Sequence, residues 1–276
     1  MSSRRLKIAV DSRLPESVEP TVKRLYSVVE RHYRSVHPGR KTERECHDEF
    51  VADVFGSQER YERHRAAFDD QRNEWQEPVE RLSRWLDTEL DQRIEEVREF
   101  YAVTRAVEPG VVVETGVANG LSTLAVLLAL EDNGYGQLYS VDYPFRADES
   151  LAAFRSETWS GSGGMAIPAD EDPGWVIPDD AEYRDRWSLR LGKSQRELPR
   201  LLTEIDGPDL FFHDSEHSLP CMLFELELAN EWVGKGGVIV VDDVQWNHAF
   251  DSFTSVRDPG RWGYISDEIG YVGPLE

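Results

Sequence analysis

The chain has 276 residues, 39% of them hydrophobic, which is enough for one sizeable core and a smaller appendage. It carries 53 acidic and 31 basic residues, for a formal net charge of −22, and only five of the bases are lysines. This balance argues against a nucleic-acid partner, and no apolar run is long enough for a membrane span or a secretory signal. We therefore expect a cytoplasmic protein with an acidic surface of the kind suited to a salt-rich cytosol. Its two cysteines, Cys46 and Cys221, are too few for a disulfide framework.

The first part of the chain, residues 1–105, predicts a helical N-terminal extension. Helical spacing of apolar residues indicates helices over 18–33, 43–55 and 59–68, and one long helix over 78–107. The apolar face of that long helix contains Leu82, Trp85, Leu86, Leu90, Ile94, Val97 and Tyr101, and Pro109-Gly110 ends it. We expect a cap or an oligomer surface attached to one catalytic domain, residues 106–276.

A nucleotide-shaped turn begins the second part. Val111–Val113 is typical of a buried parallel strand, and Leu121–Leu130 indicates the helix that follows. Gly116 and Gly120 lie between them, where glycine lets the backbone approach a ligand and the helix start offers unpaired N–H groups. Asp142 ends the next strand, in a position to accept hydrogen bonds from the two hydroxyls of a ribose.

The spacing of these glycines indicates which nucleotide the turn suits. A dinucleotide turn has the pattern G-x-G-x-x-G, whereas Gly116 and Gly120 form G-x-x-x-G. Glu114 at the strand end would repel a phosphate but suits a cationic ligand such as S-adenosylmethionine. Here the chain resembles the class I S-adenosylmethionine-dependent methyltransferases. The resemblance implies a cofactor site at Glu114, Gly116, Asn119, Gly120, Ser122 and Asp142.

Strands and helices continue to alternate after Asp142. Residues 143–185 form a long segment that we interpret as a substrate-side lid, with a hinge at Gly161–Gly164 and an anchor at Gly174–Pro178. Further strands are expected over 187–191, 210–212 and 238–241, with a closing hairpin within 262–272. The predicted fold class is α/β, a doubly wound, mostly parallel Rossmann-like sheet with an N-terminal helical extension.

Acidic side chains follow two of the predicted strands. Asp214 follows the fourth strand, and Asp242 and Asp243 follow the fifth. Neighbouring strands lie about 4.8 Å apart, so these carboxylates can converge on one ion. Carboxylates without a soft ligand suit Mg²⁺, Mn²⁺ or Ca²⁺, and without a cation they would repel one another. We predict a divalent cation, Mg²⁺ or a similar ion, at these three residues.

A histidine near these acids is a candidate base. His217 lies one helical step beyond Asp214, and its ordinary pKa near 6.5 suits removal of a proton from a hydroxyl at neutral pH. His213 and His217 also have i, i+4 spacing, so a two-histidine metal site remains an alternative. His213 still belongs to the strand end, however, where helical spacing does not apply. His248 is a weaker candidate.

Over residues 111–244 the chain resembles, more narrowly, the metal-dependent catechol-type O-methyltransferases. The resemblance implies that Ser194 and Gln195 contact adenine and that Asp214 and Asp242 bind the metal. His217 stands where catechol enzymes have a catalytic lysine, and Asp243 where an asparagine is common. Residues 242–250 also look like a broader group of methyltransferases, some of which act on sugars or natural products.

Together these features predict a methyltransferase that moves a methyl group from S-adenosylmethionine to a hydroxyl of a small molecule or sugar. Asp214 and His217 are the expected catalytic residues. An NAD-dependent oxidoreductase and a metal-dependent hydrolase are the alternatives, and a non-catalytic binding module is the weakest reading. We expect a small-molecule or sugar acceptor as partner, neither nucleic acid nor a membrane, and leave homo-oligomerisation open.

Overall fold

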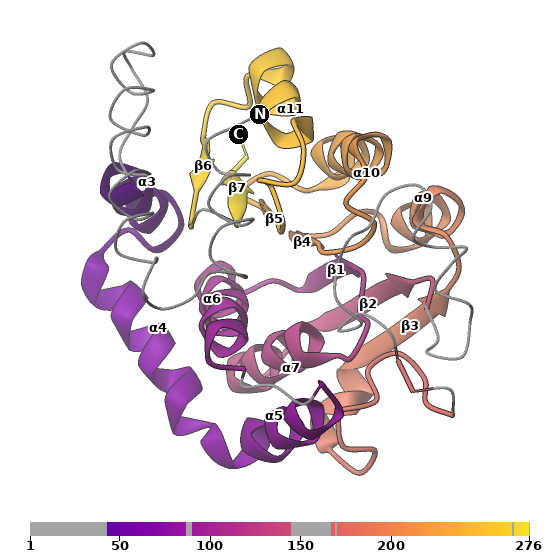
Figure 1. Cartoon of the computed structure of the whole chain (residues 1–276). Helices are drawn as coiled ribbons and strands as arrows, with labels where there is room; N and C mark the ends of the chain where they lie inside the picture. Colours follow the sequence, from indigo (N-terminus) through magenta and orange to yellow (C-terminus); the bar gives the residue numbers. More distant parts are fainter. Residues whose placement is uncertain (1–42, 87–89, 145–166, 169, 267, 276) are drawn as a thin grey trace, which may run out of the picture.

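The structure, a computed structural model, describes residues 43–86, 90–144, 167–168, 170–266 and 268–275 (Figure 1). Its helices are α3 (Glu43–Phe50), η1 (Val51–Phe55), α4 (Gln58–Asp70), α5 (Arg72–Leu86), α6 (Asp91–Val107), α7 (Leu121–Asn133), η3 (Glu182–Arg186), α9 (Ser194–Ile205), α10 (Leu219–Trp232) and α11 (Ala249–Arg257). Its strands are β1 (Val111–Thr115), β2 (Gln137–Asp142), β3 (Trp187–Leu191), β4 (Leu210–His213), β5 (Val238–Val241), β6 (Trp262–Tyr264) and β7 (Gly270–Val272). The predicted helix over 18–33 lies outside the described residues.

The strands form one mixed sheet in the order β3-β2-β1-β4-β5-β7-β6. The first five are parallel, and β7 and β6 add an antiparallel hairpin at one edge. The chain moves outward from β1 to β3 and then returns to β4 on the other side of β1. Ligands of such sheets bind beyond the carboxyl ends of the strands, at this reversal. The predicted fold class and its closing hairpin are confirmed.

Two hydrophobic cores lie on the two faces of the sheet. Because successive strand side chains point to opposite faces, Val112 packs in the core shared with α6 and α7, whereas Val113 packs in the core under α9, α10 and α11. Figure 1 shows these two sets of helices on opposite sides of the sheet. Helix α7 is apolar on every side because the sheet, α5 and α6 enclose it. This three-layer arrangement fixes where the strand ends lie relative to the helices.

The N-terminal helices pack directly on the sheet domain. Phe50 lies against Tyr271 of β7 with ring centroids 5.2 Å apart, and the Tyr271 hydroxyl donates to Asp53 at 2.8 Å. The hydroxyl of Tyr61 on α4 donates to Glu99 on α6, also at 2.8 Å. These buried contacts link the helices to both β7 and α6. The domain boundary predicted near residue 105 stays a prediction.

The prediction of one long helix over 78–107 is wrong. Two helices take its place: α5 begins earlier, at Arg72, and ends at Leu86, and α6 begins at Asp91. Apolar residues continue at helical spacing across the break. Leu82 and Leu90, on its two sides, are both buried in the same core.

Part of the predicted lid is seated on the nucleotide-shaped turn. Gly174 N–H donates to the Ala118 carbonyl at 2.9 Å, and Val176 N–H donates to the Asn119 carbonyl at 3.2 Å. Trp175 is buried and meets Trp85 of α5 edge-on, with ring centroids 6.2 Å apart. The predicted anchor therefore contacts the turn itself. The predicted hinge at Gly161–Gly164 lies outside the described residues.

Within the described part of the chain, none of the helices combines the length and the apolar character that a membrane crossing requires.

Candidate active site

The turn after β1 is shaped by two glycines in the left-handed region, with φ of +86° at Gly116 and +96° at Gly120. A Cβ on Gly116 would lie 1.9 Å from the backbone oxygen of Asp214, and a Cβ on Gly120 would lie 2.5 Å from the Cα of Gly174. Neither position admits a side chain. The turn is consequently in backbone contact with both the loop after β4 and the segment that contains Gly174.

Asp142 at the end of β2 holds this turn in place. Its Oδ2 accepts hydrogen bonds from the backbone N–H groups of Val117, at 2.6 Å, and Ala118, at 2.8 Å. Burial raises the pKa of Asp142, although these two bonds oppose the shift. Asp142, the residue predicted to bind a ribose, thus also supports the turn. Both backbone bonds fall on Oδ2, and the predicted contact of Asp142 with a ribose stays a prediction.

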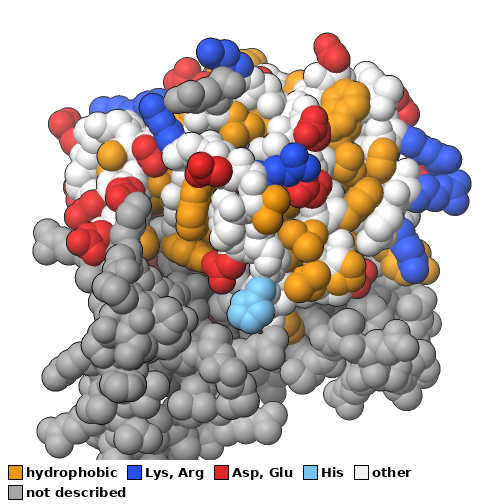
Figure 2. Space-filling view, turned by 90° about the horizontal axis from the view of Figure 1, so that it is seen from above, with side chains coloured by type: hydrophobic (Ala, Val, Ile, Leu, Met, Phe, Trp, Pro, Cys, Tyr) orange, Lys and Arg blue, Asp and Glu red, His pale blue; other side chains and the backbone are white. Residues whose placement is uncertain are grey.

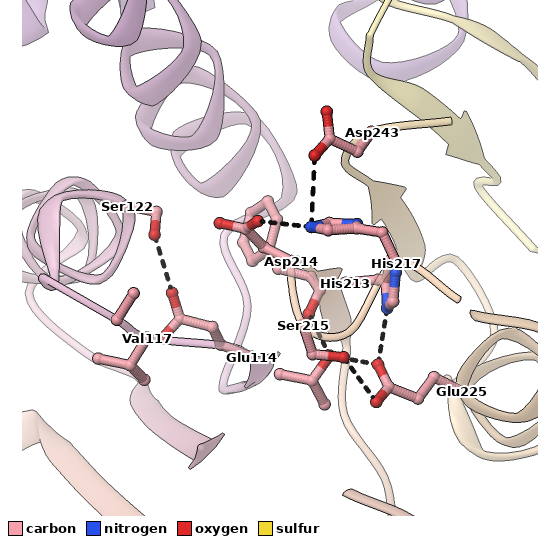
Figure 3. Close-up of polar contacts among 12 residues, drawn as sticks. Glu114, Val117, Ser122, His213, Asp214, Ser215, His217, Glu225 and Asp243 are labelled. Atoms are coloured by element: carbon pink, nitrogen blue, oxygen red, sulfur yellow. Dashed lines mark hydrogen bonds and ion pairs between the residues drawn. The ribbon is translucent and has the colours of Figure 1, made fainter. Parts of the chain in front are cut away.

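Glu114 lies beneath the turn, with 1% of its surface exposed. Thr123 donates to its carboxylate at 2.9 Å and Ser140 at 2.7 Å, while Ser122 approaches at 3.4 Å (Figure 3). Burial raises the pKa of Glu114 to about 7 despite these donors. The structure brings Glu114 together with Ser122 but surrounds the carboxylate with hydroxyl groups. Its predicted contact with a cationic ligand stays a prediction.

The other predicted cofactor residues lie around the turn and at the start of α9. Asn119 accepts the backbone N–H of Leu121 on its side-chain oxygen at 2.9 Å, so its side chain stabilises the start of α7. Ser194 and Gln195 lie beside α10, where Gln195 Nε2 donates to Cys221 Sγ at 3.1 Å. Their predicted contact with adenine stays a prediction.

Asp214, His217 and Asp242 form the group in the described chain that could hold a metal ion. One potential ligand atom from each lies within 4.8 Å of the other two. Figure 3 shows the Nε2 atom of His217 between two carboxylates, 3.8 Å from Asp214 and 3.4 Å from Asp243. Asp214 and Asp242 belong to this group and Asp243 lies beside it, next to His217, while the predicted cation at the three acids stays a prediction. The structure also brings in His217, which was predicted as a base rather than a ligand.

The electrostatics of this cluster favour a cation. Burial, followed by the negative charge of Asp243, raises the pKa of Asp214 to about 8. Burial and then Asp214 and Asp243 raise the pKa of Asp242 well above its ordinary range. Burial, aided by Glu268, raises the pKa of Asp243 to about 6. Crowded carboxylates of this kind hold protons in the absence of a positive partner.

His217 is neutral at physiological pH. Burial, and next the charge interaction with His213, lower its pKa to about 3. In the tautomer that carries its proton on Nδ1, the lone pair of Nε2 can accept a proton or coordinate a cation. His213 Nδ1 contacts Glu225 at 2.6 Å, and the group that could hold a metal in the described chain contains His217 and not His213. The alternative of a two-histidine metal site is not supported by this geometry.

Sequence reasoning missed three acids near the site. Burial, followed by Glu268, raises the pKa of Glu96 to about 7, with a smaller contribution from Asp243. Glu96 belongs to α6 and Glu268 to the loop before β7, so their approach to the strand ends depends on tertiary packing. The third acid, Glu225, is fully buried on α10. A carboxylate on the same face as Met222 and Leu226 is the one local signal that sequence could have offered.

Comparison with known proteins agrees with this arrangement. Residues 113–244 match a family model described as a methyltransferase domain. The calicheamicin methyltransferase CalS11 is 14% identical and superposes with a TM-score of 0.50 over 71% of this chain and 91% of its own. The tomaymycin-pathway O-methyltransferase TomG of Streptomyces achromogenes is 15% identical, with a TM-score of 0.46 over 71% and 87% of the two chains. No curated protein sequence matches the chain.

The structural likeness to CalS11 shows the fold, and the family match covers the turn, Asp142, Asp214 and Asp242. The resemblance inferred from the sequence is therefore confirmed. Residues 113–244 thus match a methyltransferase domain, in a fold that the chain shares with CalS11.

Proposed function

We propose that this enzyme transfers a methyl group from S-adenosylmethionine to a hydroxyl group of a small molecule or sugar, assisted by a divalent cation. The observation that carries the proposal is the contact between two sites. Gly116 of the turn lies directly against the backbone of Asp214, which belongs to the acid cluster. A donor held by the turn and an acceptor held by the cluster would therefore be neighbours, as a direct transfer requires.

The residues of the turn fit the donor. S-adenosylmethionine, when bound, supplies an already activated methyl group. Gly116 and Gly120 leave room for close backbone approach, the free oxygen of Asp142 is suited to a ribose hydroxyl, and Ser194 and Gln195 are suited to adenine. The helix start at Leu121 adds backbone N–H groups that attract a carboxylate.

The acid cluster fits a hard divalent cation. Asp214 and Asp242 offer carboxylate oxygens, the hard ligands that suit Mg²⁺ or Mn²⁺. A cation here would supply the positive charge that favours loss of a proton from an acceptor hydroxyl. The raised pKa values of the cluster are the sign that such charge is needed. Asp243 would support the same site from beside His217.

His217 would take the proton of the acceptor hydroxyl. Its ring is held in a buried position, and the neutral state leaves Nε2 able to accept. The segment around Gly174 closes over the turn and would exclude water from the donor. Because the sulfonium is already activated, alignment of oxygen, methyl and sulfur would supply much of the rate.

The test is calorimetric titration with S-adenosylhomocysteine. The wild type should bind it, and Asp142→Ala should lose at least about tenfold in affinity, because both the support of the turn and the ribose acceptor disappear. Asp70→Ala, an exposed position on α4, is the matched control and should bind as the wild type does. Binding of NADH in place of S-adenosylhomocysteine would refute the proposal.

A further inference from the structure

Glu225 is a fully buried carboxylate that no step of the proposed reaction uses. It lies on α10, and both of its oxygens are occupied (Figure 3). Oε2 accepts from the Thr115 hydroxyl and faces His213 Nδ1, both at 2.6 Å. Oε1 accepts from the Ser215 hydroxyl at 2.8 Å and from the Cys221 thiol at 3.5 Å. A buried charge with this many donors is an ordered feature of the fold.

The partners of Oε2 lead to the two carboxylates of the proposed cation site. The carbonyl of Thr115 accepts the backbone N–H of Asp214 at 2.9 Å, and the carbonyl of His213 accepts the backbone N–H of Asp242 at 2.9 Å. Glu225 thus fixes the side chains of the two residues whose backbones hold Asp214 and Asp242. The other oxygen of Glu225, Oε1, accepts from Ser215, which is the residue immediately after Asp214.

The same carboxylate also reaches the donor side. Thr115 is the residue immediately before Gly116, where the turn begins. Ser194, at the proposed adenine end, lies 3.7 Å from the sulfur of Cys221, whose thiol donates to Glu225. A change in the backbone conformation of Thr115 would shift Gly116. Gly116 already lies close against the backbone of Asp214, so there is no room for such a shift.

We infer that Glu225 is a positioning residue that sets the donor turn and the cation-binding carboxylates in register with each other. It acts through Thr115, His213 and Ser215 and contacts neither ligand. The inference rests on the proposed function for the identity of those ligands. It assigns to α10 the task of aligning two halves of the site that come from different strands.

The experiment measures the affinity of purified full-length protein for S-adenosylhomocysteine and, separately, for Mn²⁺, by calorimetry well below the melting temperature. Glu225→Gln keeps the shape but turns one acceptor into a donor that faces other donors, so both affinities should fall by about tenfold. Glu227→Gln is the matched control. It lies on the same helix, partly exposed, and pairs with Arg257. Both of its affinities should equal those of the wild type.

Two single-contact variants keep the test decisive even if Glu225→Gln does not fold. Thr115→Val replaces the hydroxyl with a methyl group and should weaken the binding of S-adenosylhomocysteine more than that of Mn²⁺. Ser215→Ala should weaken Mn²⁺ more than S-adenosylhomocysteine. A general loss of stability would not lower the affinity for one ligand in one variant and for the other ligand in the other variant. Folded variants whose two affinities stay within twofold of the control would overturn the inference.

The wild type separates this inference from the proposed function. If it binds S-adenosylhomocysteine but not Mn²⁺, the cation part of the proposed function fails. A selective loss of S-adenosylhomocysteine affinity in Thr115→Val and Glu225→Gln would then still support a positioning role on the donor side. If the wild type binds neither ligand, both proposals are overturned.

Discussion

Glu114 is the residue whose position most changes the interpretation of the cofactor turn. A carboxylate at this strand end was predicted to meet the ligand, yet the side chain lies in a pocket of hydroxyl groups beneath the turn. The residue type and its place at the strand end could be read from the sequence. The hydroxyls that enclose it, from Thr123 and Ser140, come from α7 and β2, and their convergence needs the packed fold.

The buried state of Glu114 makes a pH-dependent stability prediction. Its pKa is about 7 in the folded protein and near 4.5 ordinarily, so the folded state binds the proton more tightly. Stability contributed by this group is therefore present at low pH and is lost as pH rises from about 4.5 to 7. Between those limits Glu114→Gln should gain roughly 3 kcal/mol in unfolding free energy relative to the wild type. Urea unfolding at a series of pH values measures this, with Glu62→Gln on α4 as an exposed control. A difference that does not vary with pH would contradict the assignment.

His217 Nε2 faces the acids and can serve either as proton acceptor or as cation ligand, but not as both at once. Replacement by glutamine decides between the roles. If the nitrogen accepts the proton, His217→Gln should bind Mn²⁺ within about threefold of the wild type, because Asp214, Asp242 and Asp243 remain. If it is a ligand, Mn²⁺ affinity should fall by about tenfold or more. We expect the first result, and calorimetry with Mn²⁺ measures it. His248→Gln, at an exposed histidine, is the control.

At the scale of elements, the strands were the most predictable part. The strands over 187–191 and 238–241 were placed with their observed bounds, and the strand over 210–212 to within one residue. Runs of apolar residues bounded by glycine, proline or charge define such buried strands well. The break between α5 and α6 could not be read because a helical period crosses it without interruption. Tertiary contact, rather than local pattern, also brings Glu96 of α6 to the strand ends.

The turn after β1 and the loop after β4 interlock, and a pair of glycines tests this contact. Gly116→Ala would force a Cβ into the backbone of Asp214, so the two loops must separate. We expect a loss of about 3 kcal/mol in unfolding free energy, combining left-handed strain with overpacking. Gly134→Ala has a similar φ of +78° but open space around it, and should lose only about 1 kcal/mol. Urea unfolding compares them. Equal losses would mean that strain alone, and not the interlock, governs Gly116.

At the scale of the whole molecule, negative charge is both general and local. The chain carries a formal net charge of −22, and the face in Figure 2 shows scattered acidic side chains together with basic and hydrophobic ones. Separately, Asp214, Asp242 and Asp243 crowd together at the strand ends. Repulsion between surface charges should weaken with any added salt, whereas repulsion within the cluster should be relieved by a bound divalent cation. The composition predicted the first effect, and the order of strands predicted the second.

The effect of general screening and the effect of a bound cation on stability can be separated by comparing NaCl with Mg²⁺. Raising NaCl from 0.05 to 1 M should increase the melting temperature by roughly 5 °C, because screening weakens repulsion over the whole surface. With NaCl held at 1 M, Mg²⁺ at a hundredfold excess over its dissociation constant should add about 2.7 kcal/mol of stability, since it binds only the folded site. Asp214→Asn should keep the NaCl effect and lose the Mg²⁺ effect. Without Mg²⁺ this variant should be at least as stable as the wild type, because one of the crowded charges is gone. A Mg²⁺ effect that vanishes in 1 M NaCl, or that survives in Asp214→Asn, would assign it to screening instead of to the cluster at the ends of β4 and β5.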